Sequence, residues 1–294
     1  MPAFVATLVA APGALTDVAV ARVAQVLPAP VAKRWLEPGE AADLLLDTAV
    51  DVDPKVLNAA ASESGADVIL QPFATRDKKL IVADMDSTLI GQECIDELAD
   101  VAGVGQRVAD ITERAMRGEL DFEAALRERV GLLKGLDAGV ISKLLAERIV
   151  LNPGAKTLAA TFRARGGYFA IVSGGFVPFT AAVAEWLGAD EHRANRFGVV
   201  GGRLTGDVEE PLQGADAKLQ ALRELRDLLG LPASAVMAIG DGANDLPMLG
   251  EAGLGVAYRA KPKVAATAHA RLEHGDFTAL LFAMGITRSE FVAA

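Results

Sequence analysis

Asp84 and Asp86, separated by one residue, form the first pattern in this sequence that could do chemistry. They come directly after the apolar run 80–83, which is typical of a buried strand. Two carboxyl groups this close favour keeping one protonated, so one could attack as a nucleophile while the other handles a proton. The pair alone is weak evidence, because Asp84 could simply cap the turn while Asp86 faces solvent.

A second acidic turn, Gly-Asp-Gly-Ala-Asn-Asp at 240–245, follows the apolar run 235–239. Its glycines allow the backbone to approach a ligand closely. Mg²⁺ takes about six oxygen ligands, often one or two carboxylates together with waters and a phosphate. Asp84 and Asp241 could supply those carboxylates, although an ordinary Asp-Gly turn would have the same sequence.

Ser173 and Lys218 offer groups that bind anions. Ser173 is followed by Gly174 and Gly175, so we expect a hydroxyl and exposed backbone N–H groups at the start of a helix. Lys218 lies at the start of a predicted helix, where its ammonium could neutralise both a phosphate and an attacking carboxylate. Taken singly, these residues would be a flexible turn and a surface lysine.

The elements that must position these residues predict an α/β fold. Apolar runs at 80–83, 168–172 and 235–239 predict strands, and 155–165 and 217–229 predict helices between them. This alternation predicts a Rossmann-like parallel sheet covered by helices. Ligands of such sheets bind beyond the carboxyl ends of the strands, where all three polar turns lie. Their joint occurrence makes coincidence a poor explanation.

Two segments interrupt this alternation. Residues 94–149 are strongly helical and contain no strand-like run, which predicts a helical cap inserted after the first strand. Residues 194–208, with two glycines at 201–202, predict a hairpin that protrudes from the sheet.

The first 75 residues predict a separate, small α+β domain with the element order βαββαβ. Its expected strands are 4–9, 31–36, 43–46 and 67–70, and its expected helices are 16–26 and 54–64. Residues 71–79 contain Pro72 and three basic residues, which predicts a linker. We therefore expect two domains, 1–75 and 76–294, with the cap at about 94–149 inserted in the second.

Composition and charge exclude several classes of function. The 294 residues are 51% hydrophobic and 23% charged, as expected of a packed globular protein. The formal charge of −10 argues against a nucleic-acid partner, because no basic stripe is available. Mean hydropathy is +0.29. The apolar runs are nevertheless far shorter than the roughly 20 residues that span a bilayer, so no membrane partner is expected.

The cysteine content and the first residues predict the compartment. Cys94 is the single cysteine, so an internal disulfide framework is excluded and a reducing cytoplasm is expected. Residues 1–15 are apolar, but no basic residue precedes Arg22 and a helical pattern follows, which argues against a signal peptide. We therefore expect a cytoplasmic protein.

Taken together, the polar segments resemble the haloacid dehalogenase-like phosphatases. The matching elements are Asp84-x-Asp86-x-Thr88, Ser173, Lys218 and Gly240-Asp241-Gly242-x-Asn244-Asp245. Within that superfamily the chain is similar to the phosphoserine phosphatase family over roughly residues 78–282, in the segments 91–96, 115–118, 121–123, 129–130, 194–196 and 204–206. Residues 1–75 resemble an ACT-type regulatory domain.

The resemblance implies a magnesium-dependent phosphatase that works through a phospho-aspartyl intermediate. Asp84 would attack phosphorus, while Asp86 would protonate the departing oxygen and later take a proton from water. Mg²⁺ would lie between Asp84, Asp241 and the backbone carbonyl of Asp86.

The same resemblance implies which groups hold the phosphate. Ser173, the Gly174 N–H and Lys218 would bind the phosphoryl oxygens, whose charge must be balanced in the transition state. Asn244 would bind the phosphate or a neighbouring group, and Asp245 would orient Lys218 or the metal shell.

Substrate choice would depend on the cap. By similarity, Glu93 would bind a substrate ammonium and Arg129 a substrate carboxylate, which its forked guanidinium matches. Met116 and Phe122 would cover the closed site and exclude water. The implied substrate is O-phosphoserine, hydrolysed to L-serine and inorganic phosphate in the last step of serine biosynthesis.

Two alternatives stay open. The chain could be a phosphatase or phosphotransferase for another small phosphomonoester, such as phosphohomoserine. It could also be an amino-acid-sensing regulatory protein, given the resemblance of its first 75 residues. The oligomeric state is open as well, and a homodimer is one option.

Overall fold

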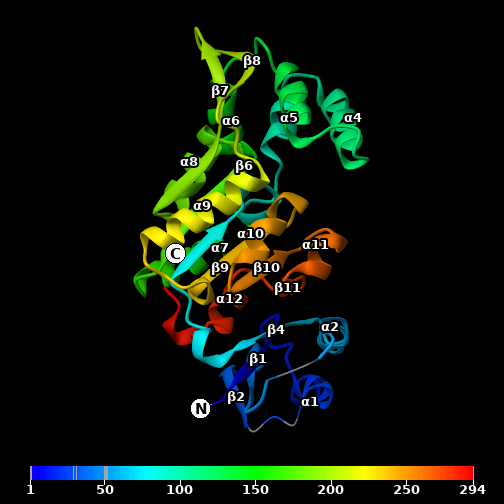
Figure 1. Cartoon of the computed structure of the whole chain (residues 1–294), viewed down its shortest axis with the longest axis vertical. Coiled ribbons are helices and arrows are strands. Elements are labelled where there is room, and N and C mark those ends of the chain that lie inside the picture. Colours follow the sequence, from blue (N-terminus) through cyan, green and yellow to red (C-terminus); the bar gives the residue numbers. More distant parts are fainter. Residues whose placement is uncertain (1, 29, 31, 50–51, 294) are drawn as a thin grey trace.

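The structure of the protein is a computed structural model that describes residues 2–28, 30, 32–49 and 52–293. Its two β-sheets lie one above the other along the longest axis (Figure 1). The smaller sheet belongs to the N-terminal residues, drawn in blue, and the larger sheet to the rest of the chain.

The N-terminal sheet has four antiparallel strands in the order β2-β3-β1-β4, and α1 and α2 pack together on one face of it. The elements are β1 Phe4–Ala10, α1 Asp17–Val26, β2 Ala32–Glu37, β3 Ala41–Leu46, α2 Pro54–Ser62 and β4 Ala66–Pro72. The predicted order βαββαβ is confirmed. Val31, the first residue of the second expected strand, lies outside the described residues.

Local sequence explains where α1 and α2 begin. The Thr16 side chain accepts a hydrogen bond of 3.2 Å from the N–H of Ala19. Asp53 accepts one of 2.8 Å from the N–H of Lys55, and Pro54 occupies the first helical position, where no N–H is needed. Such caps satisfy N–H groups that have no partner inside the helix.

The larger sheet has seven strands in the order β11-β10-β9-β5-β6-β7-β8. The described strands run parallel from β11 to β7, and β8 pairs antiparallel with β7. The elements are β5 Leu80–Ala83, α7 Ala155–Ala164, β6 Tyr168–Phe176, α8 Val177–Leu187, β7 Glu191–Val200, β8 Arg203–Glu209, α9 Ala215–Leu228, β9 Val236–Gly240, α10 Leu246–Glu251, β10 Leu254–Tyr258, α11 Pro262–Thr267, β11 Ala270–Leu272 and α12 Thr278–Ala283. The predicted Rossmann-like α/β fold is confirmed.

Strand β5 lies in the interior of this sheet, between β9 and β6. Ile81 packs into the core on one face of the sheet, and Leu80 and Val82 pack into the core on the other. Because helices cover both faces, every residue of the strand is apolar rather than every second one. The chain leaves this strand directly at Asp84.

The inserted cap of the described chain contains α3 Cys94–Val101, α4 Gly105–Met116, α5 Phe122–Gly131 and α6 Val140–Glu147. Its two connections to the core run side by side. Ile90 and Leu151 form a β-bridge, and the N–H of Gly91 donates to the carbonyl of Val150 at 3.2 Å. Helices α4 and α5 project from one end of the molecule (Figure 1).

Strands β7 and β8 form the predicted hairpin, and the hairpin is bonded to the cap. The N–H of Gly135 donates to the carbonyl of Leu204 at 2.8 Å, and the N–H of Leu204 donates to the carbonyl of Leu136 at 2.9 Å. The connection between α5 and α6 is therefore held by the hairpin, and the cap is fixed there as well as at its two connections to the core.

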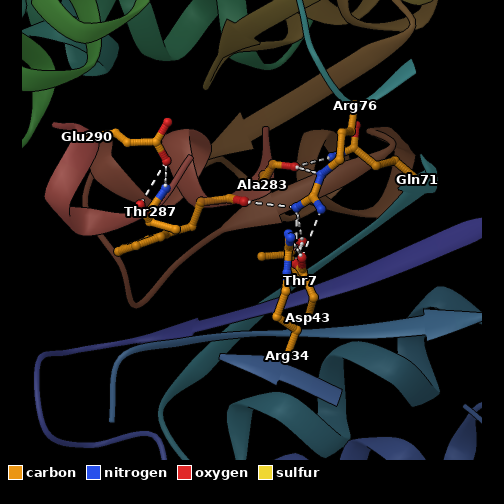
Figure 2. Close-up of polar contacts among 9 residues, drawn as sticks. Thr7, Arg34, Asp43, Gln71, Arg76, Ala283, Thr287 and Glu290 are labelled. Atoms are coloured by element: carbon orange, nitrogen blue, oxygen red, sulfur yellow. Dashed lines mark hydrogen bonds and ion pairs between the residues drawn. The ribbon is translucent and has the colours of Figure 1, made fainter. Parts of the chain in front are cut away.

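The segment expected to be a linker, residues 71–79, joins β4 to β5, and Gln71 and Arg76 within it make buried contacts with α12 (Figure 2). The Arg76 side chain, 6% exposed, donates to both carboxylate oxygens of Asp43 at 2.8 and 3.0 Å. It also donates to the carbonyls of Phe282 and Ala283 at the end of α12, both at 3.0 Å. The segment thus connects the two sheets, and its basic residues Arg76 and Lys78 are buried rather than exposed to solvent.

Asp67 forms a second junction between the two sheets. Its carboxylate accepts hydrogen bonds from the backbone N–H groups of Glu273, His274 and Gly275 at 2.9, 3.0 and 2.7 Å. Successive N–H groups that point at one carboxylate make a small anion-binding concavity. The N-terminal sheet is thus attached through buried polar contacts at two separate places.

The helices of the described chain are short. The longest, α9, has 14 residues and covers one face of the larger sheet. Across the described ranges, no helix combines the length and the apolar composition that crossing a membrane requires.

Two glycine substitutions on neighbouring elements test the packing of α10 against β10. A Cβ on Gly255 would overlap the carbonyl oxygen of Leu249, whereas a Cβ on Gly250 meets nothing within 4 Å. We expect Gly255→Ala to lower the free energy of unfolding by about 3 kcal/mol, since backbone cannot move aside cheaply. Gly250→Ala, in the helix, should leave it unchanged or raise it by up to about 1 kcal/mol. Urea unfolding followed by circular dichroism measures both, and equal effects would contradict this packing.

Candidate active site

The four residues singled out by the sequence meet at the carboxyl edge of the larger sheet. Asp84 follows β5, Asp241 follows β9, Ser173 lies near the end of β6 and Lys218 lies in the first turn of α9. Parallel neighbours end at the same edge, so three strands and the start of α9 bring polar side chains to one place.

Asp84 is held from three directions. Its N–H donates to the carbonyl of Ile239 at 2.9 Å, which ties it to β9. Its Oδ1 accepts the N–H of Met85 at 2.7 Å, and its Oδ2 lies 2.6 Å from the Nζ of Lys218. Burial and the nearby Asp245 raise the pKa of Asp84 well above its usual range, and Lys218 opposes that shift. The residue is 5% exposed, and these contacts fix the orientation of its carboxylate.

Lys218 is fully buried, which excludes the reading of it as a surface lysine. Its Nζ lies 2.6 Å from Asp84 and 2.7 Å from Asp245. Burial by itself lowers the pKa of Lys218, but the two carboxylates more than offset it and raise the pKa above the ordinary value. The side chain therefore carries a positive charge at neutral pH.

Asp245 has both carboxylate oxygens engaged. Oδ1 accepts from Lys218, and Oδ2 accepts the N–H groups of Asp241 and Gly242 at 3.1 and 3.0 Å. A Cβ on Gly240 would overlap the Asp245 side chain, so this glycine leaves the space that Asp245 fills. These contacts fit the expectation that Asp245 orients Lys218.

A divalent cation fits the carboxylates at this edge. Asp84, Asp241 and Asp245 each offer one oxygen, and these oxygens lie within 4.8 Å of one another. Because Asp245 is already bonded, Asp84 and Asp241 are the better placed ligands. Burial raises the pKa of Asp241 to about 6, and Thr88 Oγ1 donates to its Oδ1 at 2.8 Å. An all-oxygen set of this kind suits hard cations such as Mg²⁺ or Mn²⁺.

Asp86, two residues beyond Asp84, occupies a different environment. Its Oδ1 accepts the N–H of Cys94, the first residue of α3, at 3.2 Å. Burial and the charge of Glu93 raise the pKa of Asp86 to about 7. A carboxyl group that holds its proton near neutral pH is suited to general acid catalysis. A Cβ on Gly175 would lie 2.5 Å from its Oδ2, so a larger residue there would require the Asp86 carboxyl group to shift.

Ser173 is buried beside these groups, but it is not at the start of a helix as expected. Strand β6 continues through Phe176, and α8 begins at Val177. The reason is a bulge: Val172 pairs with Arg193 and Phe176 with Asn195, so residues 173–175 lie opposite Ala194 alone. The N–H of Gly175 donates to Ser173 Oγ at 2.9 Å, so that N–H is already used.

Glu93 and Arg129 lie on the cap side of the site. Glu93 accepts a hydrogen bond of 2.6 Å from the hydroxyl of Ser87, a residue with a strained φ of 54°. Arg129 Nε donates to the carbonyl of Ala125 at 3.2 Å. Burial lowers the pKa of Arg129, and Asp96, Glu93 and Asp86 oppose that shift. The guanidinium therefore faces the same acidic region that contains Glu93 and Asp86.

The cap covers the bulge through Phe122. A Cβ on Gly174 would lie 3.5 Å from the Phe122 ring, and a Cβ on Gly214 would lie 3.2 Å from it. The ring thus lies against both glycines, one before α8 and one before α9. Asn244 lies half-buried in the turn after β9. The side chain of Met116 lies outside the described part of the chain.

Sequence reasoning did not foresee the supporting roles of Ser87, Thr88 and Asn195. Thr88 bonds Asp241, and Ser87 bonds Glu93, from within the segment that contains both catalytic aspartate candidates. Their position in that segment was the available signal. Asn195 lies far from it in sequence, and its contacts depend on the bulge in β6.

Comparison with known proteins gives consistent similarities. Residues 81–250 match the family of haloacid dehalogenase-like hydrolases. A phosphoserine phosphatase of Streptomyces coelicolor is 45% identical over 249 residues, which cover 83% of this chain and 60% of that protein. The chain therefore spans less than two thirds of that relative's length.

Two solved structures are similar over large parts of the chain. A probable phosphoserine phosphatase from Vibrio cholerae has a TM-score of 0.79 and 33% identity, over 98% of this chain and 88% of that one. A phosphoserine phosphatase solved as a phospho-aspartyl intermediate analogue has a TM-score of 0.65 and 41% identity, over 70% of this chain and 98% of that one.

Cation binding by Asp84 and Asp241 can be tested without measuring turnover. A ligand that binds the native state at 100 times its Kd stabilises it by about 2.7 kcal/mol. We expect Mg²⁺ added to chelator-treated protein to raise Tm, and Asp241→Asn to lose most of that rise. The control is Asp227→Asn, which replaces an exposed aspartate on α9 and should leave the Mg²⁺-dependent rise in Tm unchanged. An equal rise in both variants would place the cation elsewhere.

Proposed function

The chain belongs to the haloacid dehalogenase-like hydrolases, and we propose that it is a cytoplasmic phosphatase that converts O-phosphoserine to L-serine and inorganic phosphate, the last step of serine biosynthesis. The observation that carries the proposal is the contact of Asp84 with the buried Lys218, beside Asp241. A nucleophile, a phosphate-neutralising cation and a metal ligand are thus grouped at one edge. The similarity to phosphoserine phosphatases supports the substrate.

In the proposed reaction the Asp84 carboxylate attacks phosphorus and the bond from phosphorus to the seryl oxygen breaks. Asp86, with a pKa of about 7, gives its proton to the departing oxygen, which leaves as serine. Asp86 then takes a proton from water, and that water attacks phosphorus in the aspartyl phosphate. Inorganic phosphate leaves and the Asp84 carboxylate is restored.

The proposed metal ligands are Asp84, Asp241 and the backbone carbonyl of Asp86, with Thr88 holding Asp241 in place. Bound there, Mg²⁺ would supply positive charge to the phosphoryl oxygens. Among the protein's own groups, the Ser173 hydroxyl, the Gly174 N–H and the Lys218 ammonium would bind those oxygens.

Outside that set, Asn244 would bind the phosphate or a group next to it, from the turn after β9. Asp245 would keep the Lys218 ammonium directed at Asp84, because it bonds Lys218 through one oxygen and the turn backbone through the other. Phe122 would exclude water from the closed site.

The amino-acid part of the substrate would bind between Glu93 and Arg129. Glu93 would accept from the ammonium and Arg129 would donate to the carboxylate. The partly buried position of Arg129 supports this assignment, because a desolvated guanidinium gains more from a substrate carboxylate than an exposed one.

The proposed domain boundary lies at residues 75–76, with the cap at about 94–149 within the second domain. Residues 1–75 would then be a regulatory or assembly unit, and a homodimer formed with a second copy is part of this proposal. The buried contacts of Arg76 and Asp67 support a unit that is firmly attached rather than free on a tether.

Replacing the proposed nucleophile provides the first test. We expect Asp84→Asn to lower kcat for O-phosphoserine by roughly a thousandfold or more. The fold should survive, because Lys218 keeps its contact with Asp245. Phosphate release and circular dichroism measure the two effects, with Asp227→Asn as the control. Full activity in Asp84→Asn would rule out this nucleophile.

Replacing Arg129 tests the substrate. We expect Arg129→Ala to raise KM for O-phosphoserine by roughly tenfold or more, because a bidentate contact to its carboxylate is lost. Hydrolysis of phosphoethanolamine, which has the ammonium but no carboxylate, should be unchanged by the substitution. Arg107→Ala, an exposed arginine of α4, is the matched control. Faster turnover of phosphohomoserine than of O-phosphoserine by the unaltered protein would favour the alternative substrate.

A further inference from the structure

Asn195 is a buried side chain that the proposed reaction does not use. It lies on β7, with 1% of its surface exposed, and β7 supplies none of the proposed catalytic groups. Its position in the sheet is opposite Phe176, immediately after the three residues of β6 that bulge out of the ladder.

The bulge leaves a backbone carbonyl without a partner on β7, and the Asn195 side chain donates to it. Residues 173–175 lie opposite Ala194 alone, so the backbone groups of the bulge cannot all pair with β7. A buried backbone carbonyl that does not pair with the neighbouring strand destabilises the fold unless a different group donates a hydrogen bond to it. Asn195 Nδ2 donates to the carbonyl of Gly174 at 2.9 Å.

The same amide also holds the segment that leads into α9. Asn195 Nδ2 donates to the carbonyl of Gln213 at 3.3 Å, and its Oδ1 accepts the N–H of Gln213 at 2.7 Å. Gln213 precedes Gly214, the N-cap of the helix that carries Lys218. Rotating the amide by half a turn would set Oδ1 against two carbonyl oxygens, so the hydrogen-bond network determines its orientation.

We propose that Asn195 is a positioning residue that fixes the phosphate-binding bulge at Gly174 relative to the start of the helix that carries Lys218. The inference rests on the proposed function and adds to it. The Gly174 N–H and the Lys218 ammonium, both proposed to bind phosphoryl oxygens, come from elements that are not adjacent in sequence. One side-chain amide sets the distance between them.

The direct test is Asn195→Asp, which keeps size and shape but cannot donate. Its carboxylate would face the carbonyls of Gly174 and Gln213 and repel both. A displacement of about 1 Å at a binding group can cost roughly 100-fold in rate, so we expect kcat/KM for O-phosphoserine to fall by roughly 10- to 100-fold, with KM raised. Asn195→Ala, which adds no charge, should also lower kcat/KM and raise KM. It replaces Asn195→Asp in the test if that variant does not fold.

Thr161→Val is the matched control. Thr161 is a fully buried residue of α7, which supplies none of the proposed catalytic groups. Its hydroxyl oxygen accepts a hydrogen bond from the N–H of Val292. Both substitutions remove a buried hydrogen bond, so both should lower Tm. Measured well below Tm, only the Asn195 variants should change KM. A purely structural role for Asn195 predicts lowered Tm with unchanged KM in both, which would overturn the proposal.

A second readout separates this inference from the proposed substrate. Beryllofluoride with Mg²⁺ mimics an aspartyl phosphate and requires no particular leaving group. We expect it to bind the unaltered protein and Thr161→Val equally and the Asn195 variants at least about tenfold more weakly. Failure of the unaltered protein to hydrolyse O-phosphoserine would refute the substrate alone. Equal beryllofluoride affinity in Asn195→Asp and the unaltered protein would refute the role of Asn195.

Discussion

The buried charge of Lys218 is the constraint on which the rest of the active-site edge depends. An ammonium withdrawn from water is strongly destabilised unless carboxylates compensate for the lost hydration. Asp84 and Asp245 provide that compensation at 2.6 and 2.7 Å. Since the three residues come from the end of β5, the first turn of α9 and the turn after β9, these elements must be in register before the charge is satisfied. Correct folding of the sheet edge and assembly of the site therefore require the same contacts.

At the junction between the two sheets, a buried arginine likewise depends on acceptors from separate elements. The Arg76 guanidinium is shared between Asp43 of the N-terminal sheet and the last carbonyls of α12. A helix ends with unpaired carbonyls and a partial negative charge, so a cation there is favourable. Loss of either the Asp43 carboxylate or the α12 carbonyls would leave N–H groups of the buried Arg76 without acceptors. The N-terminal sheet is consequently part of the environment that keeps α12 and β11 in place.

Local patterns made much of the fold and of the site predictable, and contacts between distant segments account for what was missed. Asp84 could be recognised because a buried parallel strand ends there, and Lys218 because it begins a helix at the same edge. The buried contacts of Arg76 within the linker were missed, since its acceptors at Asp43 and α12 are far away in sequence. Ser173 was misplaced at a helix start, because the bulge depends on pairing with β7, which sequence periodicity does not reveal.

The two aspartates that open the site illustrate how neighbouring residues of one type acquire different tasks. Asp84 lies 2.6 Å from the ammonium of Lys218, which opposes the rise in its pKa caused by burial and Asp245, whereas burial and Glu93 raise the pKa of Asp86 to about 7. The backbone turns directly after Asp86, with Ser87 in the left-handed region and its N–H bonded to the carbonyl of Gln92 at 3.1 Å. The neighbouring charges therefore differ: an ammonium contacts the proposed nucleophile, whereas the carboxylate of Glu93 lies near the proposed acid. The glycine at 175 helps to keep the Asp86 carboxyl group in this position, because a Cβ there would lie 2.5 Å from its Oδ2 and require it to shift.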